Sequence, residues 1–358
     1  FKPVSTEFGW TRAATSGAQS LCFLLTGFLS IVMGRLNDKF GPRIVLLGCG
    51  LFFGSGYLLI SQIGAIWQLY LFYGVIVAIG LGGTYVPLAS TASRWFVKRR
   101  GLMTGITLSG IGVGMMVMSP VANWLISSYG WRTSYIIIGI IALVLVIVPA
   151  WFLRRDPGQL GLLPYGEEEV RQDRLGGEDK DFSFQEALHT RQYWLVCAML
   201  FCCWFSTAVI MTHIVIHAVG LGISAASAAG ILAIIGGVNI PGRIVMGGVA
   251  DKIGSKSTLV ISFIVMSVAL LWLMVAKEVW MFYLFAAIFG FAYGALAILE
   301  SLVVAELFGL SSHGAIFGAV FFSDSIGSAT GTVLAGHIFD ITGSYHSAFL
   351  VCIGVGWI

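Results

Sequence analysis

Long apolar stretches alternate with short polar segments along the whole chain. Each stretch runs for about 20 to 27 residues, and a helix needs about 20 residues to cross the hydrocarbon of a bilayer. The stretches lack the two-residue alternation of a transmembrane β-barrel. The pattern therefore predicts ten complete membrane-spanning helices and part of an eleventh, at residues 16–34, 44–65, 67–93, 101–127, 133–153, 194–219, 224–248, 259–276, 279–305, 315–339 and from 347 onward.

The composition agrees with a chain whose solvent is lipid. Hydrophobic residues make up 58% of the sequence and charged residues 10%, whereas charged residues are about a quarter of a soluble domain. The formal net charge is +3, but no polar segment combines a basic patch with aromatic residues, so nucleic acid is not an expected partner. The sequence predicts an all-α integral membrane protein in contact with the lipid bilayer.

One long polar segment divides the chain. Residues 154–191 hold six basic and nine acidic side chains, so we predict an N-terminal transmembrane bundle at 1–153, a linker at 154–191 and a C-terminal bundle at 192–358. The run FSFQEALHTRQYW at the end of the linker predicts a short amphipathic helix. Most other basic residues lie in loops on the same side as the linker, and loops rich in Lys and Arg stay in the cytoplasm. We expect a multi-pass protein of the plasma or inner membrane with a cytoplasmic linker.

The two halves of the chain are copies of each other. GRLNDKFGPR at 34–43 matches GGVADKIGSK at 247–256, an offset of 213 residues, and the same offset relates Gly101 to Gly314. Both copies enter the turn from the same side, so the repeats run parallel and predict two six-helix bundles. In this register the first helix of the first half falls before residue 1, and the last helix is cut short. We therefore expect a fragment of a twelve-helix protein that lacks helix 1 and part of helix 12.

The repeated turn has the pattern G-x-x-x-D-[KR]-x-G-x-[KR]. Its glycines allow a tight turn, its aspartate can accept hydrogen bonds from a helix N-terminus, and its basic residues can face lipid headgroups. The turn resembles the motif between helices 2 and 3, and again between helices 8 and 9, of the major facilitator superfamily of secondary transporters. The resemblance implies the fold of that family and a conformational role for Gly34, Asp38, Lys39, Gly41, Arg43, Gly247, Asp251, Lys252 and Gly254.

Three further stretches narrow the resemblance. RWFVKRRGLMTGITLSGIGVG (94–114), YGWRTSYIIIG (129–139) and GHIFDITGSYHSAF (336–349) resemble the monocarboxylate transporters and their bacterial relatives, including the oxalate–formate exchangers. The run RIVMGGVAD fits a helix-8 pattern of that family and places Arg243 on its substrate-binding arginine. Animal members have an aspartate four residues earlier, where this chain has Asn239. A coupling role for that carboxylate is therefore not carried over.

Arg243 also stands out on chemical grounds. A guanidinium stays charged in proteins, and a charge near the middle of a membrane costs from about 2.5 to more than 10 kcal/mol. Arg243 precedes Asp251 by eight residues, or about 12 Å of helix, so it must face a cavity or a partner. Its repeat counterpart is Ser30, so the charge does not belong to the shared scaffold. A planar fork of donors matches a carboxylate; the alternative is an arginine locked in an ion pair between helices.

Other polar residues lie at a similar depth. Asn239 is one helical turn from Arg243 and can bond either the guanidinium or the solute. Asp324 lies near the middle of its predicted helix. We hypothesise that it pairs with Arg243 when the site is empty, and that its protonation frees Arg243 for the substrate and couples transport to H⁺. The alternative is a polar contact inside the second bundle. Tyr85 and Tyr293 are deep enough to line a central cavity, although packing or lipid-facing roles stay open for both.

Three motifs carry less weight. Glu300 lies nearer the end of its predicted helix, as a gate or packing residue and a weaker alternative for the proton site. His213 and His217 have a spacing that can hold a metal, but no third ligand is evident. All six cysteines lie in apolar spans, so neither disulfides nor zinc are indicated. We predict no metal and no cofactor, and the lack of a nucleophile–base pair argues against an enzyme.

Together these features predict a secondary active transporter that moves small monocarboxylates of the lactate or pyruvate type with H⁺ by alternating access. Its expected partners are a small carboxylate anion and the proton. An anion exchanger of the oxalate–formate type is an alternative, which would need a second fixed cation facing Arg243. A membrane sensor built on a transporter scaffold is another, although a linker of about 40 residues is too short for a signalling domain.

Overall fold

The computed structural model describes residues 2–10, 12–167, 181–342 and 345–355. Residues 168–180 of the predicted linker, Gly343 of the repeat and the end of the last predicted helix, from residue 356, lie outside the described ranges. Within those ranges the chain forms helices and no β-strand, and nine helical segments are long and apolar enough to cross a membrane. The predicted all-α membrane architecture is confirmed.

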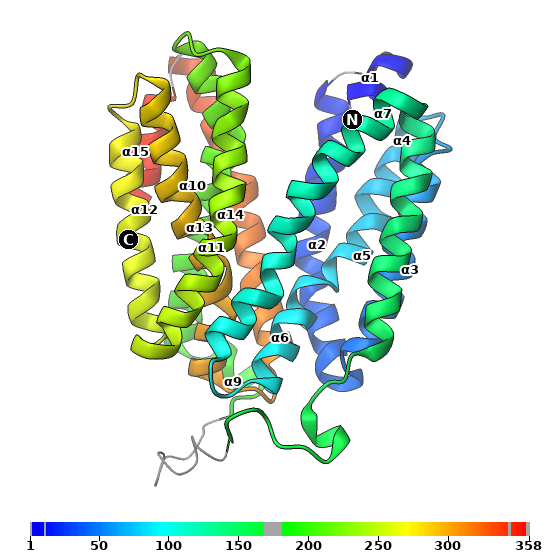
Figure 1. The fold of residues 1–358 in the computed structure, drawn as a ribbon, viewed down its shortest axis with the longest axis vertical. Coiled ribbons are helices and arrows are strands. Elements are labelled where there is room, and N and C mark those ends of the chain that lie inside the picture. Colours follow the sequence, from blue (N-terminus) through cyan, green and yellow to red (C-terminus); the bar gives the residue numbers. More distant parts are fainter. Residues whose placement is uncertain (1, 11, 168–180, 343–344, 356–358) are drawn as a thin grey trace.

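The helices stand in two bundles (Figure 1). The N-terminal bundle and the turn that follows it comprise α1 (Lys2–Phe8), α2 (Arg12–Phe40), α3 (Pro42–Ile60), α4 (Ile66–Leu69), η1 (Tyr70–Val77), α5 (Ala78–Gly82), α6 (Tyr85–Trp95), α7 (Arg100–Phe152) and η2 (Pro157–Leu160). The C-terminal bundle and the helix before it comprise α9 (Phe184–Leu188), α10 (Arg191–Gly220), α11 (Ala225–Ile253), α12 (Ser255–Leu273), α13 (Val279–Phe308), α14 (His313–Thr342) and α15 (His346–Val355).

Buried apolar side chains form two clusters. One lies in the N-terminal bundle and includes Ile60, Val77 and Trp131. The larger one fills the C-terminal bundle, where it includes Phe282, and extends across the contact to Leu108 of α7. The bundles meet at the end that carries the linker, and they diverge toward the opposite end (Figure 1). We call these two ends the linker end and the far end.

One of the predicted helices differs in detail. The segment predicted at 67–93 contains the π-helical turn η1 and a break between α5 and α6. Cys49 of α3 packs where a side chain on Gly83 would lie, so a residue without a Cβ is required at this break. The hairpin predicted between 127 and 133 is confirmed, since Gly130, with φ +75°, divides α7 into two arms. The break places Tyr85 at the start of a new helix, α6.

Close backbone contacts join the bundles at the linker end. Gly34 of α2 faces the backbone of Gly314 in α14, and Gly101 of α7 faces the backbone of Gly247 in α11. The two pairs are related by the 213-residue offset of the repeat. Small residues let membrane helices approach until their backbones touch. The glycines shared by the two halves therefore lie where the halves meet.

The short helix predicted at the end of the linker is confirmed as α9. Ser183 caps it by accepting a hydrogen bond from the Glu186 amide (3.3 Å), while its own amide donates to the Glu186 carboxylate (2.7 Å). The bonds from the amide and hydroxyl of Ser183 hold the pKa of Glu186 below its ordinary value. Phe184 lies under the Arg35 guanidinium of α2, 4.3 Å from it. The C-terminal part of the linker thus contacts the N-terminal bundle.

Candidate functional site

The two aspartates of the repeated turn bridge the bundles. Asp38 in α2 accepts hydrogen bonds from the amides of Gly314 (3.1 Å) and Ala315 (2.8 Å) at the start of α14. Asp251 in α11 accepts from the amides of Gly101 (2.6 Å) and of the next residue (2.9 Å) at the start of α7. The first amides of a helix have no intrahelical partner and carry a partial positive charge. Each carboxylate therefore satisfies donors of the opposite bundle, in the same way in both halves.

The other residues of the turn shape its path and its surface. Gly41 and Gly254 have φ of +83° and +87°, in the left-handed region that glycine adopts without strain. Arg43 stacks over the ring of Trp151 at 4.1 Å, and Lys39 lies 5.2 Å from the neighbouring phenylalanine ring. Aromatic faces attract such cations. The basic side chains thus rest on aromatic rings of their own bundle.

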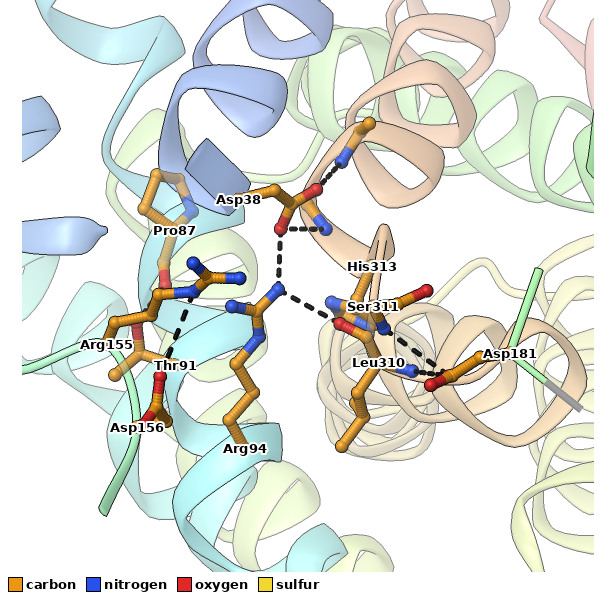
Figure 2. A network of polar contacts seen from close by, with 12 residues as sticks. Asp38, Pro87, Thr91, Arg94, Arg155, Asp156, Asp181, Leu310, Ser311 and His313 are labelled. Atoms are coloured by element: carbon orange, nitrogen blue, oxygen red, sulfur yellow. Dashed lines mark hydrogen bonds and ion pairs between the residues drawn. The ribbon is translucent and has the colours of Figure 1, made fainter. Parts of the chain in front are cut away.

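An arginine present in only one half strengthens one side of this contact. One nitrogen of the Arg94 guanidinium, Nη2, donates to Asp38 Oδ1 (2.7 Å) and to the carbonyl of Leu310 (3.0 Å), as Figure 2 shows. The side chain is 7% exposed. The repeat counterpart of Arg94 is Leu307. The contact between α2 and α14 therefore has an ion pair for which the repeat supplies no equivalent beside Asp251.

The end of the linker is bonded to the same turn. Asp181 accepts hydrogen bonds from the amides of Leu310 (2.9 Å) and Ser311 (3.4 Å), between α13 and α14 (Figure 2). The neighbouring Phe182 amide donates to the carbonyl of Phe308 (3.0 Å). The turn that receives Arg94 from one bundle is thus held by the linker on its other side.

Arg243 lies deeper, where α11 crosses α7. It is 3% exposed. Its Nε donates to Asn239 Oδ1 (2.8 Å), one turn away in the same helix, and its Nη1 donates to the carbonyl of Leu108 in α7 (2.8 Å). Its Nη2 makes no hydrogen bond to the described residues. The guanidinium therefore bridges the two bundles and keeps an unengaged donor edge.

The pair expected between Arg243 and Asp324 is not formed. Asp324 is 2% exposed, and neither of its carboxylate oxygens has a hydrogen-bond partner among the described residues. It lies on the face of α14 that meets α10, where the adjacent Ser323 donates to the Cys197 carbonyl (3.4 Å). Arg243 instead reaches toward α7. The two residues have similar depths, but their helices direct them to different neighbours.

A third ionisable residue is buried in the C-terminal bundle. Glu300 of α13 is 1% exposed and accepts a hydrogen bond from the indole nitrogen of Trp204. It interacts electrostatically with both Arg243 and Asp324.

The two tyrosines interact with these ionisable residues. Tyr85 donates to the carbonyl of Ala297 in α13, one turn before Glu300, and thereby links α6 to the C-terminal bundle. Tyr293 packs edge-to-face against Trp204, with ring centroids 5.7 Å apart. Both tyrosines are half-buried. Both interact electrostatically with Arg243 and Glu300, and their role in lining a central cavity stays a prediction.

Sequence reasoning missed Arg94 and Trp204. Arg94 was counted only among the basic residues on the side of the linker, yet its repeat counterpart is not basic, and that same test had singled out Arg243. No pattern in the sequence distinguished Trp204 from the other tryptophans. His213, considered as a metal ligand, contacts the Tyr345 hydroxyl and the Thr332 carbonyl, both at 3.2 Å. In the described ranges no group of three His, Cys, Asp or Glu side chains is placed to hold a metal.

Comparisons with known proteins agree with this architecture. A family model described as Major Facilitator Superfamily matches residues 1–259 and 239–358. Monocarboxylate transporter 12 of Mus musculus is 26% identical over 371 residues, covering 97% of this chain and 74% of the mouse protein. The oxalate:formate antiporter of Oxalobacter formigenes is 30% identical over 274 residues, covering 75% of this chain and 62% of that protein. The solved structure of the Escherichia coli fucose:proton symporter FucP matches with a TM-score of 0.74 at 16% identity, over 99% of this chain and 92% of that chain, which shows likeness of fold alone.

Proposed function

Because this chain belongs to the major facilitator superfamily, we propose that it is a secondary active transporter of small monocarboxylates of the lactate or pyruvate type, coupled to H⁺. Its similarity to monocarboxylate transporter 12 and to an oxalate:formate antiporter supports a small organic anion as the solute. The single observation that carries the proposal is the buried guanidinium of Arg243, which keeps donors unengaged at the crossing of the two bundles.

The chemistry around Arg243 favours a single carboxylate as cargo. Nη2 and the second hydrogen of Nη1 can bind the two oxygens of a carboxylate, and Asn239 fixes the guanidinium plane from the other edge. Tyr85 and Tyr293 supply hydroxyl groups for the rest of a small acid. Apart from Arg243, the charged side chains that interact with these groups are Glu300 and Asp324, and both are acidic. A dianion such as oxalate needs a second cation, so the monocarboxylate is the better match.

The transport cycle follows from the contact at the linker end. We assign the linker to the cytoplasm, because the basic residues of the loops gather on its side. The contact between the bundles is then a closed cytoplasmic gate, held by Asp38, Asp251 and the glycines of the repeated turn. Opening this gate and closing the far end would expose Arg243 to the cytoplasm instead of the opposite side of the membrane. Such rocking of two repeats about a central site is how transporters of this architecture alternate access.

The test is uptake by the purified protein in proteoliposomes. Radiolabelled lactate, pyruvate, formate and oxalate are offered separately, with and without an inwardly directed H⁺ gradient. We expect uptake of the monocarboxylates, stimulated by the gradient, and its loss in Arg243→Gln. The matched control is Arg191→Gln, which removes an exposed arginine at the start of α10 and should leave uptake unchanged.

Two results would contradict the proposal. One is a folded protein that transports none of the four acids; the other is uptake that survives Arg243→Gln at the unaltered rate. Uptake of oxalate that depends on formate inside the vesicle, and not on the H⁺ gradient, would establish exchange instead.

A further inference from the structure

Three carboxylate oxygens are buried in the C-terminal bundle without a hydrogen-bond donor. They are both oxygens of Asp324 and Oε2 of Glu300, and none has a partner among the described residues. The one donor recorded for the two carboxyl groups is the indole nitrogen of Trp204, which serves Oε1 of Glu300. An ionised carboxylate buried without donors or a counter-charge costs several kcal/mol. The arrangement therefore requires protons or cations that the protein's own basic groups do not supply.

The charges around the two carboxyl groups can be counted. The ionisable groups that interact with Asp324 or Glu300 from the elements packed around them are Tyr193, Cys197 and Cys203 of α10, Arg243 of α11, Tyr85 of α6 and Tyr293 of α13. In this set Arg243 alone is cationic. One guanidinium balances one carboxylate. The second carboxyl group must therefore be neutral if Arg243, Glu300 and Asp324 together are to have no net charge.

The contacts decide which carboxyl group is neutral. Asp324 has no donor on either oxygen, and Arg243 is not among the groups that act on it. Glu300 has the Trp204 donor and interacts directly with Arg243. Of the two, Glu300 is therefore better placed to carry a negative charge. With Asp324 protonated, Glu300 ionised and Arg243 charged, the three groups together have no net charge.

We propose that Glu300 carries the transported proton, and that Asp324 stays a neutral acid throughout the cycle. The inference rests on the proposed function. When a substrate carboxylate binds Arg243, it adds one negative charge to these three residues, which together were neutral. A proton taken from the water of the open side forms an O–H bond on Glu300 and restores neutrality; the same bond breaks when the proton leaves with the solute on the other side. The site thus moves one proton with each monocarboxylate.

The experiment separates coupling from binding. In proteoliposomes that contain the full chain, accumulation of labelled lactate or pyruvate is driven by an inward H⁺ gradient, and a trapped pH dye records proton entry. Counterflow of labelled against unlabelled substrate at equal pH measures binding and rocking without net proton movement. Glu300→Gln mimics the protonated residue, so accumulation and proton entry should be lost while counterflow stays within about twofold of the unaltered protein.

Three comparison variants complete the test. Asp324→Asn mimics the neutral acid and should keep gradient-driven accumulation, and Glu300→Asp should restore part of it. Glu306→Gln removes a more exposed carboxylate from the same helix and should change nothing. Folding of each variant is checked by size-exclusion chromatography, and a Glu300→Gln protein that does not fold leaves the decision to the other two site variants.

The outcomes distinguish this inference from the proposed function. If the unaltered protein transports none of the acids, both fall together. If it accumulates them and Glu300→Gln still accumulates them with proton entry, only the assignment of Glu300 falls. The assignment also falls if folded Glu300→Gln loses counterflow, because Glu300 would then act in binding, or if Asp324→Asn abolishes accumulation while preserving counterflow, which would make Asp324 the carrier.

Discussion

Gly105 sets the distance between the bundles beside Arg243, and Gly105→Ala should drive them apart. A Cβ built on Gly105 of α7 would lie 2.5 Å from the carbonyl oxygen of Arg243 in α11, where ordinary van der Waals contact begins at 3.4 Å. The oxygen is a backbone atom, and the backbone fixes the position of the Cβ. The two helices must therefore separate by roughly 0.9 Å at this point. Overpacking of this kind costs about 1–3 kcal/mol.

That cost applies only to the conformation in which the helices touch at the linker end. A change of about 1–3 kcal/mol in one of two conformations alters their ratio by about 5- to 150-fold. Gly105→Ala should therefore increase the population in which the linker end is open and the far end is closed. Spin labels at Ser128→Cys, beside the hairpin of α7, and at Ala226→Cys, in the first turn of α11, both lie at the far end and would report a larger fraction of short distances.

The control is Gly110→Ala in the same helix. A Cβ on Gly110 would meet nothing within 4 Å, while the gain in helix propensity of about 1 kcal/mol is common to both variants. If Gly105→Ala and Gly110→Ala give the same distance distribution, the glycine contact does not limit the approach of the bundles, and the reasoning fails.

Two further predictions concern the ends of the bundles. Asp38→Asn should open the linker end more than Asp251→Asn, measured with the same spin labels, because only Asp38 also binds Arg94; equal effects would show that the ion pair adds nothing. At the far end, the hydrogen bond from Trp131, supported by a neighbouring arginine, holds the pKa of Glu7 below its ordinary 4.5. The native carboxylate stabilises the fold above pH 4.5 and loses this effect as the pH falls through its lowered pKa. Glu7→Gln should thus lower the Tm at pH 7, and the difference should vanish in acid; a difference that persists there would refute the assignment.

The repeat made much of the linker-end contact predictable. Once Asp38 and Asp251 occupy matching positions, and Gly101 and Gly314 do as well, any contact made by one pair is expected of the other. The structure has this reciprocity. Asp38 accepts a hydrogen bond from the amide of Gly314, and Asp251 accepts one from the amide of Gly101. Residues without a copy needed a different argument, and for Arg243 the absence of a counterpart identified the position where the two halves differ.

The orientation of deep polar side chains was beyond the sequence. Depth follows from position, because each residue adds 1.5 Å along a helix, and Glu300 does interact electrostatically with both Arg243 and Asp324. The direction of a side chain changes by about 100° per residue, and the rotation of a whole helix is fixed by the neighbours it packs against. Nothing in the sequence placed α14 with Asp324 toward α10, and the expected pair with Arg243 is not formed in this structure. The interaction of Glu300 with both residues could not be foreseen for the same reason.

The difference between the inside of each bundle and the contact between bundles explains how such a protein can move without unfolding. Apolar side chains pack inside the bundles, as Phe282 and Phe289 do, and moving them apart would leave cavities. The contact at the linker end includes glycine backbones, aspartates on helix N-termini and an ion pair, beside apolar side chains such as Leu108. The donors and acceptors can bond water once they separate, so at these positions opening exchanges one set of hydrogen bonds for another. Arg243, like its counterpart Ser30, bonds across the contact at a buried position. A substrate carboxylate that replaces the Leu108 carbonyl as the partner of Arg243 would offset the cost of parting the bundles there.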